Sequence, residues 1–387
     1  METTELTFNT ELTEDQLIIK NTVREFAENN IRPRVMEFDE SQEFPMEIMH
    51  QLGKLGFLGI LVPEEFGGAG LGYVEFAIVV EELAKVDPSI ALSVAAHNGL
   101  GTNHICRFAN DTLKKKYLPD LTSGKKIAAW GLTESVSGSD AGSLRTTAEK
   151  KEDHYILNGS KTFTTHGTVG ETLVIMAITD KAKGKKGISA FILEKGMDGL
   201  IVGKKENKLG MRASDTTQLT FENCKVPAEN LIGEEGEGFI QAMKILEGGR
   251  ISIAALSVGL AQGALDASVK YSNERKQFGK NLSEFQAIQF KLADMSMNAE
   301  AARLLTLRAA YMKDKGQPNT REAAMAKLFA SEIAEKAASE AVQIFGGYGF
   351  IKDYPVEKFY RDVKLLTIGE GTSEIQRIVI ARDLLKD

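Results

Sequence analysis

Three unusually long helical segments restrict the fold of this chain more than any other feature of its sequence. Residues 239–270, 283–315 and 320–345 are rich in Ala, Leu, Glu and Lys, and each is at least about twice as long as an average helix. Short connections join them, so consecutive helices are expected to run antiparallel and to pack side by side. Residues 236–387 are therefore predicted to form a C-terminal four-helix bundle, to which a last, shorter helix contributes.

The first block, residues 1–125, is predicted to be an N-terminal α-helical domain. Thr13 begins a capping-box pattern that ends at Gln16, and apolar residues recur at helical spacing after it. Residues 46–55 and 74–86 are predicted to form two more helices, the second stopped by an Asp-Pro pair.

The middle block, residues 126–235, changes from helical to strand patterns. Short apolar runs such as 173–178 and 188–193 are separated by Gly, Asn, Asp and Lys, which favours strands joined by tight turns. We therefore predict a small antiparallel sheet or barrel with a hairpin turn at residues 158–161. The expected fold class is α+β and multidomain: an N-terminal helical domain, a central antiparallel β domain and a C-terminal helical bundle.

Composition and charge exclude several classes of protein. A formal net charge of -7 argues against a general nucleic-acid or anionic-membrane surface. Two cysteines, Cys106 and Cys224, are too few for a disulfide framework and lack a metal-ligand spacing. His97 and His104 could share a helix face, but core or capping roles are favoured over a zinc site, and no metal is predicted. Because the acidic start lacks a signal-peptide pattern and no apolar run approaches ~18 residues, a cytoplasmic enzyme without a membrane span is expected.

Common nucleotide-binding and hydrolase motifs are missing from the sequence. Residues 68–72, Gly-Ala-Gly-Leu-Gly, resemble a dinucleotide-binding fingerprint only superficially, because no apolar strand precedes them. There is no Walker loop, and no serine lies in a nucleophile elbow. Any chemistry must therefore depend on other segments.

Glu370 is the strongest candidate for a catalytic group. It lies between Gly369 and Gly371 and just before a Thr-Ser helix start. Glycine neighbours carry no side chain, so a substrate or a flat ring can approach closely. A single carboxylate on such a turn is suited to general-base catalysis.

Four other segments combine glycines, aromatics and polar groups. Residues 130–140 leave a strand in a polar turn, and residues 158–165 place an aromatic beside two hydroxyls. Residues 273–279 put cations at the end of a long helix, where an Arg could bind a pyrophosphate, and residues 343–349 end another helix in glycines. Each also has an ordinary explanation as a strand exit, a β-turn or a helix C-cap, and singly that explanation is favoured.

Taken together and in this order, the segments resemble the acyl-CoA dehydrogenase family over nearly all 387 residues. The resemblance is closest to the short-chain, butyryl-type branch. It implies FAD-dependent oxidation of an acyl-CoA to the trans-2-enoyl-CoA, with an electron-transfer flavoprotein as electron acceptor and a homotetramer as the assembly. Two alternatives stay open: a flavin oxidase or monooxygenase of the same fold, and a non-catalytic helical binding module.

The resemblance also implies roles for individual residues, with Glu370 as the catalytic base and its N–H as part of the oxyanion site. The residues that would bind FAD are Trp130, Gly131, Leu132, Thr133, Ser139, Phe163, Thr164, Thr165, Arg275, Phe278, Gln286, Gln343, Ile344, Phe345, Gly346, Gly347, Thr372, Ser373 and Glu374. The residues that would bind acyl-CoA are Ser139, Glu247, Gly248, Gly249, Arg250 and Gly371.

Several positions depart from the family pattern. Some branches carry the base immediately before the Arg of the long helix, but here Gly249 stands at that position, so Glu370 is preferred. The usual Pro after Thr-Glu is Ser135, and the usual Ile after Phe163 is Thr164. The residue before the base is often Tyr and here is Gly369, which leaves the acyl chain length and branching open.

Overall fold

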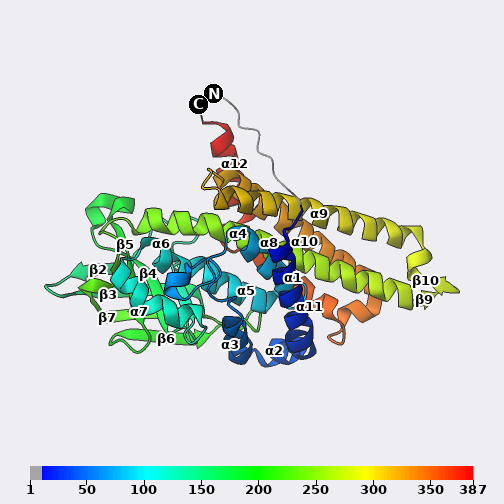
Figure 1. Cartoon of the computed structure of the whole chain (residues 1–387), viewed down its shortest axis with the longest axis horizontal. Coiled ribbons are helices and arrows are strands. Elements are labelled where there is room, and N and C mark those ends of the chain that lie inside the picture. The colour runs from blue at the N-terminus through cyan, green and yellow to red at the C-terminus, as the bar shows by residue number, and fades with distance from the viewer. Residues whose placement is uncertain (1–10, 387) are drawn as a thin grey trace.

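A single helix of 37 residues, α8 (Gly238–Glu274), forms the axis of the fold. In the computed structural model, which describes residues 11–386, it runs from the sheet at one end of the molecule to the β9–β10 hairpin at the other (Figure 1). Within those residues it is the one helix that is long and apolar enough to cross a membrane by length and composition, although no apolar run of ~18 residues was expected from the sequence. Its apolar window is 83% buried inside the protein, so internal packing explains its hydrophobic character.

Within residues 11–386, seven α-helices precede the sheet, and α4, α5 and α6 pack directly against α8. Thr13 caps the first of them and forms the predicted capping box with Gln16. The predicted helix 74–86 ends earlier than expected, and the Asp-Pro pair begins the next helix instead, because Asp87 caps it and Pro88 occupies its first turn. The seven helices are α1 (Glu14–Phe26), α2 (Val35–Ser41), α3 (Met46–Lys54), α4 (Tyr73–Ala84), α5 (Pro88–Ala96), α6 (Asn103–Phe108) and α7 (Asp111–Thr122).

The middle of the chain forms one mixed sheet with the strand order β6-β7-β3-β2-β4-β5-β8. It is not antiparallel throughout, as the sequence suggested, because β1 and β2 both pair parallel with β4. Parallel pairing is possible here since long connections carry the chain back to the same end of the sheet. The strands are β1 (Ala128–Gly131), β2 (Thr147–Lys150), β3 (His154–Thr165), β4 (Thr172–Ile178), β5 (Ile188–Glu194), β6 (Leu200–Lys205), β7 (Thr216–Pro227) and β8 (Leu231–Ile232).

The predicted hairpin turn at residues 158–161 is wrong, because this segment lies inside the long strand β3. The glycine of this segment, Gly159, lies where the pairing register between β3 and β7 shifts, just after Leu157. Gly159 has φ 139°, and a Cβ on it would lie 2.7 Å from Cα of Thr146. The Asn-Gly pair, which is typical of turns, therefore lies at an irregularity in the pairing of β3 with β7 and does not reverse the chain.

The C-terminal helices pack along α8 through small residues. Most of the buried residues of this contact are alanines, which let the helices approach closely. The predicted helix 320–345 is observed with the same ends. The remaining elements are β9 (Lys276–Gln277), β10 (Lys280–Asn281), α9 (Gln286–Asp314), α10 (Thr320–Phe345), α11 (Pro355–Asp362) and α12 (Ser373–Leu384).

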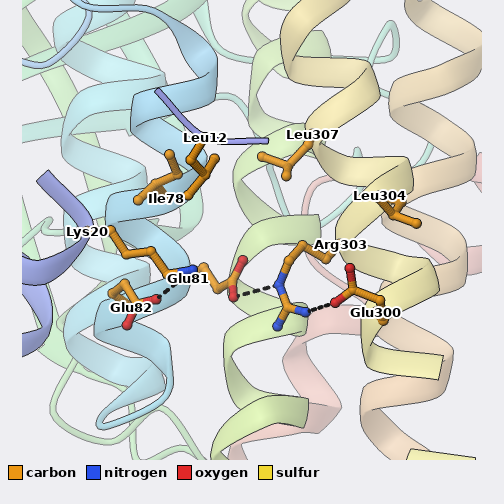
Figure 2. Close-up of a pocket in the computed structure, with 9 residues that line it drawn as sticks. All are labelled: Leu12, Lys20, Ile78, Glu81, Glu82, Glu300, Arg303, Leu304 and Leu307. Atoms are coloured by element: carbon orange, nitrogen blue, oxygen red, sulfur yellow. Dashed lines mark hydrogen bonds and ion pairs between the residues drawn. The ribbon is translucent and has the colours of Figure 1, made fainter. Parts of the chain in front are cut away.

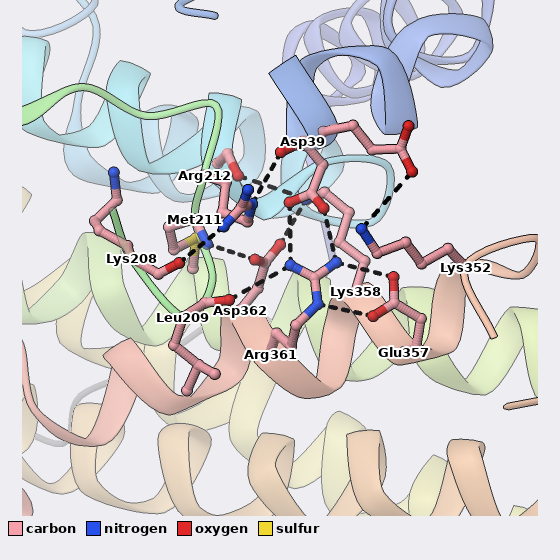
Figure 3. Close-up of polar contacts among 12 residues, drawn as sticks. Asp39, Lys208, Leu209, Met211, Arg212, Lys352, Glu357, Lys358, Arg361 and Asp362 are labelled. Atoms are coloured by element: carbon pink, nitrogen blue, oxygen red, sulfur yellow. Dashed lines mark hydrogen bonds and ion pairs between the residues drawn. The ribbon is translucent and has the colours of Figure 1, made fainter. Parts of the chain in front are cut away.

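A charged network under α11 ties together segments that are far apart in the sequence (Figure 3). Lys358 is buried and donates to Asp87 at 2.9 Å and to Asp362 at 2.6 Å. Asp362 also accepts the backbone N–H of Met211, and Arg361 donates to Asp39 at 2.7 Å. These contacts fix α11, α2, the start of α5 and the loop before β7 relative to one another.

Candidate active site

Glu370 lies in a left-handed turn between two helical segments. It follows η9 (Val363–Thr367) and precedes α12, and its φ of 52° is a conformation that few non-glycine residues adopt. Gly371 continues the turn with φ 94°, and a Cβ on it would lie 2.7 Å from Nε2 of Gln376. That Nε2 donates to the backbone carbonyls of Glu370 at 3.3 Å and of Gly371 at 2.9 Å, which stabilises the strained turn.

The carboxylate of Glu370 packs directly against the backbone of α8. A Cβ on Gly249 would lie 1.6 Å from Oε2 of Glu370, so no larger residue fits while the carboxylate keeps this position. At Gly248, a Cβ would lie 2.5 Å from the hydroxyl oxygen of Tyr73. The two glycines therefore make room for a phenol and a carboxylate at adjacent positions of α8.

Burial without pairing sets the charge state of Glu370. Its Oε2 is buried and has no hydrogen-bond partner within residues 11–386. Burial raises the pKa of Glu370 to about 7, and the cations Lys327 and Arg250 offset only part of that effect. Arg250 is itself buried, its Nε lacks a partner in the same part of the chain, and burial lowers its pKa. The carboxylate can therefore take up and release a proton near neutral pH.

Sequence reasoning missed two residues of this site, Lys327 and Gln376. Lys327 lies on α10, is fully buried and donates from Nζ to the carbonyl of Gly371 at 2.8 Å. A sequence signal existed for it, because a lone lysine stands among buried alanines at helical spacing in the run 323–330. Gln376 is buried one turn into α12, where nothing in the sequence distinguishes it from a surface glutamine.

The predicted cofactor residues of the sheet are brought together at the ends of β1 and β3. The N–H of Thr162 donates to the carbonyl of Thr133 at 2.8 Å, and the buried Lys161 donates to the carbonyl of Leu132 at 3.2 Å. Phe163 has φ 53° and is 70% exposed, so a large aromatic faces outward in a strained backbone. This cluster also contains Trp130, Gly131, Thr164 and Thr165, with Ser139 exposed in the turn beyond it.

A second group of predicted cofactor residues lies at the far end of α8. Arg275 caps that end and lies over the ring of Tyr348 at 5.4 Å. A cavity of about 460 Å³ brings Arg275 together with the end of α10. Phe278 is 94% exposed beside it. The other predicted residues at this end are Gln286, which begins α9, Gln343, Ile344 and Phe345, which end α10, and Gly346 and Gly347, which begin the 3-10 turn after it.

The structure does not bring these two groups together within one chain. Gly249 lies beside Glu370, whereas Arg275 ends the same helix. The 26 residue steps from Gly249 to Arg275 correspond to roughly 39 Å at about 1.5 Å per residue. One chain therefore offers two separate half-sites, one beside Gly249 in the first half of α8 and one at the C-terminal end of the helix.

The remaining predicted residues divide between the turn at the start of α12 and the side of α8 that faces α9 and α10. Thr372 caps α12, and Ser373 is buried there with an Oγ that has no partner within residues 11–386. Glu374 is exposed in the same first turn. Glu247 is already engaged, since it accepts from Lys313 at 3.2 Å and from Thr320 at 2.8 Å.

A cavity of about 490 Å³ between α4 and α9 contains none of the predicted site residues (Figure 2). Its charged groups are paired with one another, because Arg303 binds both Glu81 and Glu300. His97 and His104 are buried and bonded to protein groups, and residues 11–386 contain no cluster of three or more potential metal ligands. The chemistry of the molecule is thus concentrated at Glu370.

Comparison with known proteins identifies the same layout across the whole chain. Three family models match: acyl-CoA dehydrogenase N-terminal domain at residues 13–125, middle domain at 129–224 and C-terminal domain at 236–385. A curated short-chain specific acyl-CoA dehydrogenase from Clostridium acetobutylicum is 48% identical over 375 residues, covering 97% of this chain and 99% of that protein.

Two solved structures have closely similar folds. Butyryl-CoA dehydrogenase from Megasphaera elsdenii superposes with a TM-score of 0.96 at 44% identity, covering 98% of this chain and 100% of that one. A chain from a study of the electron-transferring flavoprotein of Acidaminococcus fermentans superposes with a TM-score of 0.97 at 49% identity, with coverage of 98% and 100%.

Proposed function

Because this chain belongs to the acyl-CoA dehydrogenase family, we propose that Glu370 is the base that starts the oxidation of a short-chain acyl-CoA. The protein is an FAD-dependent oxidoreductase that oxidises an acyl-CoA and passes the electrons to an electron-transfer flavoprotein. The observation that carries the proposal is the buried, unpaired carboxylate with a pKa near 7. The short-chain preference is supported by the names of the similar Clostridium and Megasphaera enzymes.

In the proposed step, Glu370 removes a proton from the carbon next to the thioester carbonyl. That C–H bond breaks and its electron pair forms the new Cα=Cβ double bond as hydride departs from the β-carbon, which gives the trans-2-enoyl-CoA. A bound FAD would supply the acceptor for that hydride. The N–H of Glu370 donates to no acceptor within residues 11–386, so it is free to stabilise negative charge on the thioester oxygen.

Several of the residues predicted to bind the cofactor offer groups that fit a flat ligand with polar edges. Phe163 presents its ring outward, and Thr164 has a buried Oγ1 without a partner in the described part of the chain. Ser373 offers a similar unsatisfied Oγ at the start of α12, a helix end that favours anionic groups. Buried hydroxyls of this kind are costly unless a ligand satisfies them, which supports the proposed flavin contacts.

We also propose that the enzyme works as a cytoplasmic homotetramer in which neighbouring copies complete each FAD site. The separation of roughly 39 Å along α8 supports this assembly. Because the two half-sites of one chain are so far apart, the residues around Arg275 of a second copy are better placed to bind the far end of an FAD molecule held beside Glu370. Cys106 and Cys224 are both free thiols, which suits a reducing compartment. Sedimentation of the flavin-loaded protein tests the assembly, and a loaded monomer would exclude it.

Anaerobic titration with butyryl-CoA tests the proposed function. The purified protein should show flavin absorbance that bleaches on addition of butyryl-CoA and returns with an electron-transfer flavoprotein. Glu370→Gln should keep the absorbance and lose bleaching by a factor of about 10²–10⁴, the usual contribution of a general base. Glu335→Gln, a carboxylate in an exposed ion pair with Lys364, is the matched control and should bleach normally.

The alternatives predict other results in the same titration. An oxidase or monooxygenase of this fold would reoxidise rapidly in air without the flavoprotein. A non-catalytic binding module would carry no flavin. Bleaching by Glu370→Gln at the wild-type rate would place the base elsewhere.

A further inference from the structure

Lys327 occupies an unusual position for a lysine. It has no exposed surface and is surrounded on α10 by the buried alanines Ala323, Ala324, Ala326 and Ala330. No carboxylate within residues 11–386 lies within 4.0 Å of its Nζ. Its one hydrogen bond in that part of the chain runs to the carbonyl of Gly371 at 2.8 Å. A buried cation without an ion pair destabilises a fold, so its presence calls for a role outside stability.

The hydrogen bond of Lys327 lies directly behind the catalytic turn. Gly371 follows Glu370, and both residues have positive φ, so the peptide that Lys327 holds determines where the Glu370 side chain points. Gln376 donates to the same carbonyl, which gives the turn two donors from two different helices. Loss of either donor should let the turn relax.

The charge of Lys327 also reaches Glu370. Lys327 on α10 and Arg250 on α8 are the cations that favour ionised Glu370. Glu332 on α10 and Glu374 on α12 act on Lys327, and Glu247 acts on Arg250. Burial lowers the pKa of Lys327 to about 8, while the nearby carboxylates partly oppose this effect. Lys327 is therefore still mostly charged near neutral pH.

We propose that Lys327 is a positioning residue for Glu370: its hydrogen bond to Gly371 fixes the left-handed turn, and its charge favours the ionised carboxylate that accepts the α-proton. The inference rests on the proposed role of Glu370 as the base. Lys327 itself touches neither substrate nor cofactor in this assignment.

Lys327→Met tests this directly, because Met has a similar length but neither charge nor donor. We expect kcat with butyryl-CoA to fall at least about tenfold at pH 7, and the midpoint of the kcat–pH profile to rise by about one unit. KM should stay within about threefold, while flavin content is kept and Tm is unchanged or higher. Lys327→Arg keeps the charge and should leave the midpoint near that of the wild type. Lys336→Met, an exposed lysine on the same helix, is the matched control and should change nothing.

Two results would overturn the inference. One is a wild-type kcat and pH profile in Lys327→Met; the other is a parallel loss of flavin and Tm in both Lys327 variants, which would mean a structural role alone. Glu370→Gln in the same assay separates this inference from the proposed function. If Glu370→Gln keeps turnover, the base assignment itself fails; if it is inactive while Lys327→Met behaves as wild type, only the present inference fails.

Discussion

Two buried lysines on neighbouring C-terminal elements face opposite surroundings. Lys358, on α11, donates to Asp362 (Figure 3) and to Asp87. Although burial opposes it, these carboxylates raise the pKa of Lys358 above the ordinary value. Lys327, on α10, makes its one hydrogen bond within residues 11–386 to the carbonyl of Gly371, and burial lowers its pKa to about 8. The first cation is fully paired, whereas the second is kept next to an unpaired carboxylate.

The difference separates a charge that holds the fold from charges that are available for chemistry. Around Lys358 two carboxylates balance the buried cation, so breaking the cluster leaves charge uncompensated. Around Glu370 the buried Oε2 and the Nε of Arg250 have no partners in residues 11–386, which is a cost to stability. Such a cost is typical of functional sites, where activity is retained at the expense of stability.

The largest expected effect is on the paired cluster. Lys358→Met should lower the free energy of unfolding by about 3–5 kcal/mol, because Asp87 and Asp362 would be left buried without their cation. Urea denaturation of the loaded enzyme measures this. Lys352→Met is the matched control, since Lys352 forms an exposed ion pair with Glu40, and it should cost at most about 1 kcal/mol. A Lys358 variant as stable as wild type would show that the network does not hold α11 in place.

At Glu370, replacing the charged group by a neutral one should raise the free energy of unfolding, the opposite of the effect expected at Lys358. The pKa of Glu370 is raised from 4.5 to about 7 in the folded protein, so its contribution to stability is greatest below about pH 4.5 and is lost as pH rises through about 7. Glu370→Gln should therefore stabilise the protein at pH 8, on the order of 1–3 kcal/mol, and have little effect at pH 5. Thermal unfolding at both values measures it, with Glu335→Gln as the exposed control. A variant less stable than wild type at pH 8 would contradict the contrast between the two clusters.

The contrast also explains what the sequence could and could not predict. The ends of α10, the capping box at Thr13 and the turn at Glu370 follow from local patterns, and all were anticipated. The partner of Gly371 was not, because Lys327 and that carbonyl are 44 positions apart and meet only through helix packing. The strand at residues 158–161 was missed for the same reason, since pairing with β7 overrides a turn-forming Asn-Gly sequence.

Turnover should follow the ionisation of Glu370 with pH. Only the carboxylate accepts a proton, so with a pKa near 7 the rate of bleaching by butyryl-CoA should rise about tenfold between pH 6 and pH 8 and then level off. Stopped-flow absorbance under anaerobic conditions measures this rate. The affinity for butyryl-CoA, followed in Glu370→Gln, should stay nearly constant over the same range. A flat profile would mean that the unpaired carboxylate is not the titrating base.

The smallest expected effect concerns substrate choice at Gly369, beside the same carboxylate. A Cβ there would lie 3.4 Å from the carbonyl oxygen of Leu365, an ordinary contact, so the fold tolerates a side chain that the sequence happens to lack. Gly369→Tyr should therefore leave Tm and flavin content unchanged while its ring narrows the space next to Glu370. Since a methylene in a pocket is worth about 1–3 kcal/mol, we expect kcat/KM for longer or branched acyl-CoAs to fall several-fold relative to butyryl-CoA. Gly369→Ala is the control and should keep the wild-type ranking. An unchanged chain-length series in Gly369→Tyr would mean that chain length is selected away from this turn, and that the open space beside the unpaired carboxylate has no part in specificity.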